Sequence, residues 1–328
     1  MTDVRQLRTL VTGGTGFLGS AVVKSLVQAG HAVTVLSRRP PNTGAHTGLS
    51  FVAGDLADPQ SVTPEIMRDV DVLIHCAVSY GSYARQMRVN VEGTRALAEA
   101  AAAAGIRRFV HISSLAVYGY RISGTTTEET RPAPAKEAYS TTKAAAEQAL
   151  QEAVSAAGLE YTIIRPGAIY GPGSGMWTDT MFRWAARPIV LFAGSGSGTV
   201  PLIYIDDLVD LIMRCAQDPA AKNQIFQAVG PQTTWRAYLE AYARLRGSFR
   251  WVGVPVPIVS AIARIIALGD RGQRRLISLP DMVQYASTAH NFSTDKASAL
   301  LGWKPHTTLE KGIASTVPYL RGKGWLAE

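Results

Sequence analysis

Residues 8–19, Arg-Thr-Leu-Val-Thr-Gly-Gly-Thr-Gly-Phe-Leu-Gly, decide the fold of this chain. The apolar residues up to Thr12 predict a buried strand, and from Phe17 onward the apolar residues recur at helical spacing. A strand that turns through glycines into a helix leaves N–H groups free at the positive end of the helix dipole, where a pyrophosphate binds. The sequence therefore predicts a dinucleotide-binding strand, turn and helix at the start of the chain.

Three glycines at three-residue spacing each have a physical role in such a turn. Gly13 permits a tight turn, Gly16 lets the backbone approach the phosphates, and Gly19 lets the helix pack closely on the strand. Phe17 and Leu18 open the helix, and we expect them to contact the cofactor together with the glycines. The alternative interpretation is a glycine-rich turn that binds no ligand.

Length and composition bound the class of protein. The chain has 328 residues, 47% of them apolar, which is enough for one large α/β domain with a smaller lobe. Cys76 and Cys215 lie in apolar stretches and are expected in the core, not in a disulfide, which favours the cytoplasm. We expect no signal peptide, because a strand begins within ten residues of Met1, and no membrane span, because the apolar run near 252–268 is interrupted. No metal site is predicted.

Strands alternate with helices along the first half of the chain, which predicts a parallel, doubly wound α/β sheet of the Rossmann type. We assign residues 1–173 to this cofactor-binding domain and place the catalytic residues in it. Residues 174–328 are expected to form mostly a smaller substrate-binding lobe, with some segments returning to the first domain. Short strands are expected there at 200–205 and 225–229, and a single helix is expected earlier, at 86–104.

The end of the second strand bears on the choice of cofactor. Ser37, Arg38 and Arg39 stand there, where a cofactor with a free ribose 2′-hydroxyl would need a carboxylate. A hydroxyl and guanidinium groups suit a 2′-phosphate instead. We therefore predict NADP(H) as the preferred cofactor, with NAD(H) as the alternative.

The ends of the third and fourth strands are expected to line the cofactor groove. Asp55 and Leu56 follow the third strand, and Ala77 follows the fourth. Asp55 could accept a hydrogen bond from the adenine amino group, or it could only shape a turn. His75, inside the fourth strand, is interpreted as a hydrogen-bonded core histidine and not as a catalyst.

Tyr139 and Lys143 are four residues apart at the start of a predicted helix, which places them on one face. The ordinary pKa of a phenol is about 10, and a neighbouring ammonium, with the helix dipole, is expected to lower the pKa of Tyr139. The pair could then exchange a proton with a carbonyl or alcohol oxygen while a hydride moves to or from a nicotinamide. Ser114, at the exit of the fifth strand, is the expected hydroxyl that holds this oxygen.

Six motifs occur in an order that is specific in combination: Thr12–Gly19, Ser113–Gly119, Tyr139–Lys143, Arg165–Gly173, Tyr204–Asp207 and Asp295–Pro305. With them the chain resembles, over nearly its whole length, the extended short-chain dehydrogenase/reductase family. That family includes nucleotide-sugar epimerases and dehydratases and the 3β-hydroxysteroid dehydrogenases, and this chain is similar to the last branch. The resemblance implies that Ser114 binds the substrate oxygen, Tyr139 is the acid/base and Lys143 tunes Tyr139 and holds the nicotinamide ribose. It also implies that Pro166 lies beside the nicotinamide.

Two departures from the family pattern bear on the reaction. Leu115 and Ala116 follow Ser114 where dehydratases carry an Asp-Glu pair, so elimination of water would lack its acid and base. Residues 196–203 hold no cation where sugar-nucleotide epimerases have an arginine for the pyrophosphate, although the arginines at 236–275 could replace it.

We therefore expect hydride transfer between a nicotinamide and the ketone or secondary alcohol of a lipophilic small molecule, such as a steroid, terpenoid or polyketide. The alternatives are a nucleotide-sugar epimerase with tightly bound cofactor and a cofactor-binding regulator without catalysis. Apolar residues of the second half either line a pocket for such a substrate or form the core of the smaller lobe. These are Met176, Trp177, Met181, Phe182, Trp184, Trp251, Val252 and Ile258.

Basic residues are concentrated between Arg236 and Arg275, where the chain has eight arginines and two acids, within a net charge of +8. This segment is either a solvated basic face or a contact for an anionic membrane surface or an acidic carrier protein, and no nucleic-acid partner is expected. The arginines of that contact would be Arg264, Arg271, Arg274 and Arg275. The family resemblance also implies a homodimer formed by helices near 90–104 and 139–157.

Overall fold

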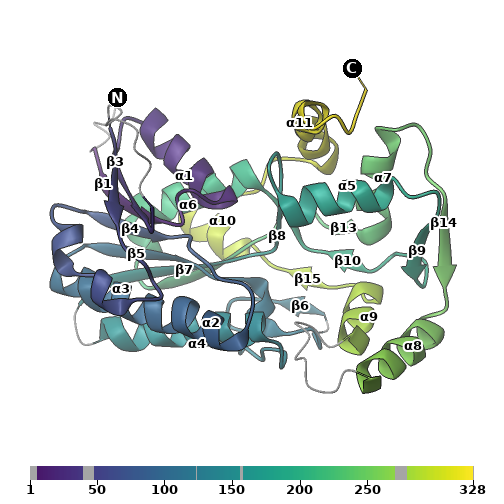
Figure 1. Ribbon diagram of the computed structural model, residues 1–328, viewed down its shortest axis with the longest axis horizontal. Helices are drawn as coiled ribbons and strands as arrows, with labels where there is room; N and C mark the ends of the chain where they lie inside the picture. The colour runs from purple at the N-terminus through teal and green to yellow at the C-terminus, as the bar shows by residue number, and fades with distance from the viewer. Residues whose placement is uncertain (1–5, 40–47, 123, 156–157, 270–278, 328) are drawn as a thin grey trace.

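Seven parallel strands form one sheet in the order β12-β7-β5-β4-β1-β2-β3, which confirms the predicted doubly wound Rossmann sheet. The computed structural model describes residues 6–39, 48–122, 124–155, 158–269 and 279–327 (Figure 1). The strands of the sheet are β1 (Arg8–Thr12), β2 (Ala32–Ser37), β3 (Leu49–Ala53), β4 (Val72–His75), β5 (Arg108–Ile112), β7 (Glu160–Pro166) and β12 (Gln224–Ala228).

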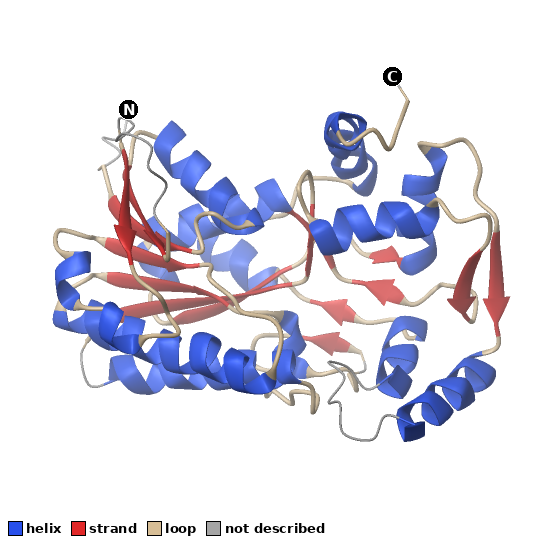
Figure 2. Cartoon of the chain, in the orientation of Figure 1, coloured by secondary structure: helices blue, strands red, loops and turns tan. Residues whose placement is uncertain are grey.

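Helices cover both faces of the sheet (Figure 2), and its strands are accordingly apolar on both sides. Leu10 and Val11 are neighbours on β1, point to opposite faces and are both fully buried. Leu10 belongs to the core shared with α3 and α4, and Val11 to the core shared with α1 and α6. These helices are α1 (Phe17–Gln28), α3 (Gly93–Ala103), α4 (Ala138–Ser155) and α6 (Ile205–Gln217). The homodimer expected through α3 and α4 stays a prediction.

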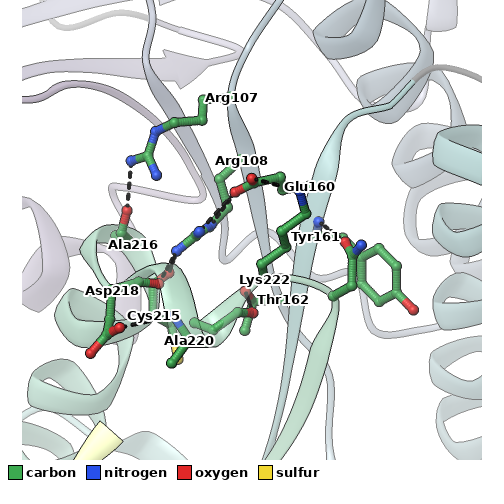
Figure 3. A network of polar contacts seen from close by, with 12 residues as sticks. Arg107, Arg108, Glu160, Tyr161, Thr162, Cys215, Ala216, Asp218, Ala220 and Lys222 are labelled. Atoms are coloured by element: carbon green, nitrogen blue, oxygen red, sulfur yellow. Dashed lines mark hydrogen bonds and ion pairs between the residues drawn. The ribbon is translucent and has the colours of Figure 1, made fainter. Parts of the chain in front are cut away.

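A buried arginine ties the amino end of the sheet together (Figure 3). The guanidinium of Arg108, the first residue of β5, donates to Glu160 Oε2 at 2.7 Å. It also donates to the backbone oxygens of Cys215 and Asp218 at the end of α6, at 2.9 and 2.5 Å. The Lys222 ammonium forms a second ion pair with Glu160 at 3.3 Å. Internal contacts thus close the amino end of the sheet, and the predicted site residues follow the carboxyl ends of its strands.

The outer lobe is the name we give to four elements at the end of the molecule away from β1, β2 and β3 (Figure 1). It comprises β9 (Val190–Ala193), β14 (Trp251–Val254), α8 (Val256–Gly269) and α9 (Leu279–Ser287). β9 and β14 pair in parallel, and α8 packs against α9.

The remaining elements lie around the sheet or between it and the outer lobe. The strands among them are β6 (Thr125–Thr126), β8 (Ala168–Tyr170), β10 (Thr199–Val200), β11 (Leu202–Tyr204), β13 (Thr233–Thr234) and β15 (Asn291–Phe292). The helices are α2 (Tyr83–Gln86), α5 (Met181–Ala185), α7 (Trp235–Arg244), α10 (Asp295–Leu301) and α11 (Leu309–Gly322). Short 3₁₀ or π turns lie at Pro59–Ser61, Pro64–Met67, Met87–Glu92, Leu115–Tyr118, Gly175–Thr180 and Pro219–Ala221.

Three expected elements differ from the structure. The strand expected at 200–205 is two strands, because Pro201 has no N–H to continue a ladder; β10 pairs with β13 and β11 with β8. The strand expected at 225–229 is β12, which joins the large sheet beside β7 and not the smaller lobe. The single helix expected at 86–104 consists of α2, a π turn and α3.

His75 is a core histidine, as the sequence predicted. Its ring nitrogens lie 2.6 Å from Thr12 Oγ1 and 3.0 Å from Thr94 Oγ1. Burial lowers the pKa of His75 to about 3, so the ring is neutral near pH 7. Cys76 and Cys215 are free thiols, partly and fully buried, as expected.

Candidate active site

The glycine turn lies where the strand order changes direction, between β1 and β4. Gly13 has φ +68°, and a Cβ there would lie 2.7 Å from the backbone nitrogen of Ala77. A Cβ on Gly19 would lie 2.1 Å from the Gly13 carbonyl oxygen. Side chains at these positions would force the turn off β4 and α1 off β1, which are the roles that the sequence predicted for the two glycines. Ligands of such sheets bind at this switch point.

The start of α1 fits the diphosphate of a dinucleotide. Gly16 is its N-cap residue, and no side chain caps the helix. The first N–H groups, including those of Phe17 and Leu18, therefore have no side-chain acceptor and point out of the positive end of the helix. The Leu18 side chain packs in the core, so only its backbone can serve the predicted contact.

The carboxyl end of β2 presents cations to the same edge. The Ser37 hydroxyl donates to the Arg39 carbonyl oxygen at 3.2 Å. Arg38 and Arg39 are exposed, and among the described residues neither guanidinium has an ion-pair partner. Both are therefore available to an anionic group on a bound cofactor.

Two residues predicted for the cofactor groove are engaged inside the protein. Asp55 Oδ1 accepts a hydrogen bond from the Ala57 N–H at 3.0 Å, so the turn-shaping role that the sequence left open is present. Leu56 is buried in the core, close against Gly93 of α3, which does not match a side chain lining the groove.

The other two residues predicted beside the cofactor lie at strand ends. Ala77 donates its N–H to Thr12 Oγ1 at 3.3 Å, and Pro166 is the buried last residue of β7.

Ser114 and Tyr139 are brought together, with the Ser114 hydroxyl close enough to the phenol to oppose part of the effect of burial on the Tyr139 pKa. Ser114 follows β5, and its Oγ also accepts the Ala116 N–H at 3.1 Å. Tyr139 is the second residue of α4, whose start is capped by the buried Glu137 carboxylate. That carboxylate accepts the N–H groups of Tyr139 and Ser140 at 2.6 and 2.7 Å. The sequence analysis missed Glu137, although an acidic residue just before a helix is a recognisable cap.

Lys143 lies one turn after Tyr139 and is buried. Its ammonium donates to the Ile112 carbonyl oxygen, at the end of β5, at 2.7 Å. Burial lowers the pKa of Lys143 to about 8, against an opposing effect of the Glu147 carboxylate. The lysine is thus held between β5 and α4 and stays mostly charged at neutral pH.

The predicted lowering of the Tyr139 pKa is wrong for this structure. Burial of the phenol raises its pKa, and Tyr80 adds to the effect, since its ring stacks on Tyr139 with centroids 5.6 Å apart. The Lys143 ammonium is bonded to a backbone oxygen and does not offset the loss of water around the phenolate. Tyr139 is therefore a neutral proton donor near pH 7.

A buried ion pair lies behind Lys143. Arg165 on β7 donates to both Glu147 oxygens, at 3.0 and 2.7 Å, and the Ser113 hydroxyl donates to Glu147 Oε1 at 2.5 Å. Arg165 also donates to the Tyr118 hydroxyl at 2.6 Å, and Gln227 donates to the same oxygen at 2.9 Å. The sequence analysis did not single out Glu147, whose only local signal is an acid four residues after Lys143.

The apolar residues weighed as pocket lining divide into two groups. Met181 and Phe182 are buried in the core, and Trp177 and Trp184 pack against it. The core interpretation therefore holds for these four. Met176, Trp251, Val252 and Ile258 are exposed to solvent.

Comparison with known proteins agrees with this geometry. The model of the NAD dependent epimerase/dehydratase family matches residues 9–228. A ceramide reductase from Caulobacter vibrioides is 31% identical over 99% of this chain and 98% of its own length. A UDP-glucose 4-epimerase from Mycolicibacterium smegmatis is 31% identical over 97% of this chain and 99% of its own length.

Among solved structures, MoeE5 in complex with UDP-glucuronic acid and NAD is similar with a TM-score of 0.75 and 25% identity, covering 96% of this chain and 99% of that one. These matches span almost the whole chain and both functional motifs, the glycine turn and the Tyr139–Lys143 pair. The chain therefore belongs to the NAD-dependent epimerase/dehydratase family and is an NAD(P)-dependent oxidoreductase of the extended short-chain dehydrogenase/reductase type.

Proposed function

We propose that this protein transfers hydride between NADP(H) and the ketone or secondary alcohol of a lipophilic small molecule. The observation that carries the proposal is the juxtaposition of the Ser114 and Tyr139 hydroxyls beside a buried Lys143, at the carboxyl end of β5 and the start of α4. A carbonyl oxygen placed between two hydroxyls can be held by one and protonated by the other.

The protein's own residues would act on the substrate oxygen. When bound, the nicotinamide supplies or accepts the hydride. In reduction, the Ser114 hydroxyl holds the carbonyl oxygen, and the Tyr139 hydroxyl donates its proton as that oxygen gains negative charge. A raised pKa keeps Tyr139 protonated near pH 7, which favours the role of proton donor. The Lys143 charge then stabilises the phenolate only in part, since the ammonium is bonded to the Ile112 carbonyl oxygen.

Two features of the chain support an apolar substrate without a diphosphate. Leu115, which follows Ser114, is buried, and neither it nor Ala116 can serve as the acid or base of a dehydration. Residues 196–203 contain β10 and most of β11, with Thr199 and Val200 buried, and they hold no cation to bind a pyrophosphate.

The preference for NADP(H) rests on the carboxyl end of β2. Ser37 and Arg38 stand where a carboxylate would be needed to bond a free 2′-hydroxyl. Arg38 is exposed there, and its forked donors match a phosphate group.

The second candidate is a nucleotide-sugar epimerase that oxidises and re-reduces one carbon without releasing its cofactor. It is favoured by the similarity to a UDP-glucose 4-epimerase, which is equal in identity to the similarity to a ceramide reductase. Both candidates use the same hydroxyl pair, so the experiment must separate them by net turnover of added cofactor.

The purified protein should be mixed with NADPH or NADH and a panel of lipophilic ketones while absorbance at 340 nm is followed. We expect consumption of NADPH with a lower Michaelis constant than that of NADH. Tyr139→Phe should lower kcat by about 10²- to 10⁴-fold, because it removes the donated proton. Tyr161→Phe, which removes a half-buried hydroxyl bonded to Gln151, is the matched control and should retain activity.

No cofactor consumption with any ketone, together with interconversion of UDP-sugars by protein that keeps its cofactor through purification, would replace the reductase proposal by the epimerase. Equal Michaelis constants for NADPH and NADH would contradict the role given to Arg38.

A further inference from the structure

One helix of the outer lobe leaves a row of isoleucines in solvent. On α8, Ile258, Ile262 and Ile265 are 51%, 50% and 68% exposed. Their spacing of four and three residues places them on one face of the helix. Ile266, also exposed, widens the same face.

α8 also has a packed side. The helix packs against α9, and its Ala263 is buried. A surface helix of a globular protein normally keeps apolar residues on its packed side and polar residues outside, and a helix that is apolar on both sides is normally covered on both. The isoleucine face of α8 therefore has the character of an interaction surface.

The neighbouring ribbon extends this surface. Leu191 of β9 and Val252 of β14 are partners in the parallel pairing and therefore share a face, and both are exposed. The inward residues of β9, Val190 and Phe192, are buried. Only Pro255 separates β14 from α8, so the two elements follow one another along the edge of the outer lobe (Figure 1).

Arginines accompany the aliphatic residues. Arg264 immediately precedes Ile265 on α8, about 100° round the helix from it, and Arg250 directly precedes β14; both are exposed. Among the residues that the structure describes, no carboxylate lies within ion-pair distance of either, whereas Glu240 is already paired with Arg244. The remaining arginines predicted for a contact, Arg271, Arg274 and Arg275, lie outside the described residues.

We propose that the isoleucine face of α8, with Arg250 and Arg264, docks the protein on an anionic membrane surface. Helices that lie in the headgroup region of a bilayer combine an apolar face with basic residues at its border. An acidic protein would account for the arginines and leave the isoleucines unexplained. A second copy of the chain would bring like charges together. The contact is peripheral, since no helix in the described ranges is both long and apolar enough to cross a bilayer.

The docking surface is linked to the candidate active site. α9, on which α8 packs, pairs Asp281 with Arg121 at 3.1 Å and places the Tyr285 ring 5.5 Å from Tyr120. The Tyr120 phenol in turn lies beside Ser140, the residue after Tyr139. Docking does not depend on the proposed function. If the proposed function holds, a lipophilic substrate would reach Tyr139 from the bilayer side.

Flotation with lipid vesicles tests the proposal. We expect the wild-type protein to bind vesicles that contain one part phosphatidylglycerol to two parts phosphatidylcholine, and to bind phosphatidylcholine alone more weakly. Ile262→Glu and Ile265→Glu should each lower partitioning onto the anionic vesicles by about tenfold or more, because they place a charge in the buried face. Arg264→Gln should lower it about fivefold, and added salt should do the same.

Leu300→Glu is the matched control, because Leu300 on α10 is an isolated leucine that is 42% exposed. It should bind vesicles like the wild type. Far-UV circular dichroism and ketone-independent cofactor binding identify any variant that has lost its fold, and Ile265→Ser serves as a milder second substitution at the same face.

Three results would overturn the proposal. The first is wild-type protein that does not float with anionic vesicles, and the second is folded α8 variants that float as well as the wild type. The third is a lack of vesicle binding combined with either of two findings. One is a wild-type dimer that Ile262→Glu dissociates, and the other is binding to an acidic carrier protein. A negative result in the ketone assay would leave the flotation result unaffected, so the two proposals fail separately.

Discussion

The Rossmann sheet gives its buried charged side chains partners, whereas the outer lobe leaves large apolar side chains in contact with water. Around the sheet, every charge discussed above that is buried has a partner: Arg108 pairs with Glu160, and Arg165 with Glu147. In the outer lobe, Ile262 on α8 is exposed to water, although contact of an apolar side chain with water is unfavourable in free energy. The comparison teaches that the sheet pairs its buried charges internally, whereas the exposed isoleucines of the outer lobe add nothing to its packed core.

The largest expected effect lies at the buried ion pair. Glu147→Gln keeps the shape of the side chain but leaves the Arg165 guanidinium buried without a counter-charge. We expect the free energy of unfolding to fall by about 3–5 kcal/mol, measured by urea denaturation. Glu152→Gln on the same helix removes an exposed carboxylate paired with Arg95 and should cost about 1 kcal/mol or less. Equal losses of stability in the two variants would show that the buried pair matters no more than an exposed one.

The second effect concerns the pH dependence of stability through Lys143. Burial lowers its pKa from the ordinary 10.5 to about 8. Below pH 8 the group is protonated in both states, and its buried charge costs about 3 kcal/mol. Between pH 8 and 10.5 the folded protein releases the proton first, so the unfolded state binds more protons and stability rises with pH.

Lys143→Met removes this contribution. The free energy of unfolding of the wild type minus that of the variant should therefore increase by about 2 kcal/mol from pH 7.5 to pH 9.5. Denaturation of both proteins at these two pH values measures the difference, and the comparison between them cancels the titration of other groups. A constant difference across this range would show that the Lys143 ammonium is not desolvated by folding.

The smallest effect is expected in the outer lobe. Ile265→Ser exchanges two residues of similar helix propensity at the most exposed position of the α8 face. We expect the free energy of unfolding to change by less than about 0.5 kcal/mol. The same substitution at Ile212, fully buried on α6, should cost more than about 2 kcal/mol. A large loss at Ile265 would mean that the isoleucine face stabilises the fold and is not reserved for a partner.

Much of the fold and part of the site could be predicted from local patterns. The glycine turn and the Tyr139–Lys143 spacing depend on residues within one strand, turn or helix, so short-range geometry decides them. Ser114 could be placed beside Tyr139 because a parallel sheet brings the ends of its strands to one edge. The direction of the Leu56 side chain, which is buried, does not follow from its position after a strand, and its predicted contact with the cofactor stays a prediction.

The contacts behind the site could not be predicted in this way. Lys143 bonds a carbonyl oxygen 31 residues away, and Glu147 bonds an arginine 18 residues away. Neither partner follows from spacing along the chain. The direction of the Tyr139 pKa shift was missed for the same reason, since burial among Tyr80, Ser114 and α4 outweighs the charge of a neighbour in sequence.

The sequence by itself determined the alternation of strands and helices that makes the sheet, the position of the glycine turn and the spacing that puts Tyr139 and Lys143 on one helix, because periodicity and spacing are properties of the chain. Only the tertiary structure decided how much water each of these groups retains. Burial raises the pKa of Tyr139 and lowers that of Lys143, and it leaves the isoleucines of α8 outside. Solvent exposure depends on all the elements packed around a residue, so only their arrangement in space determines it.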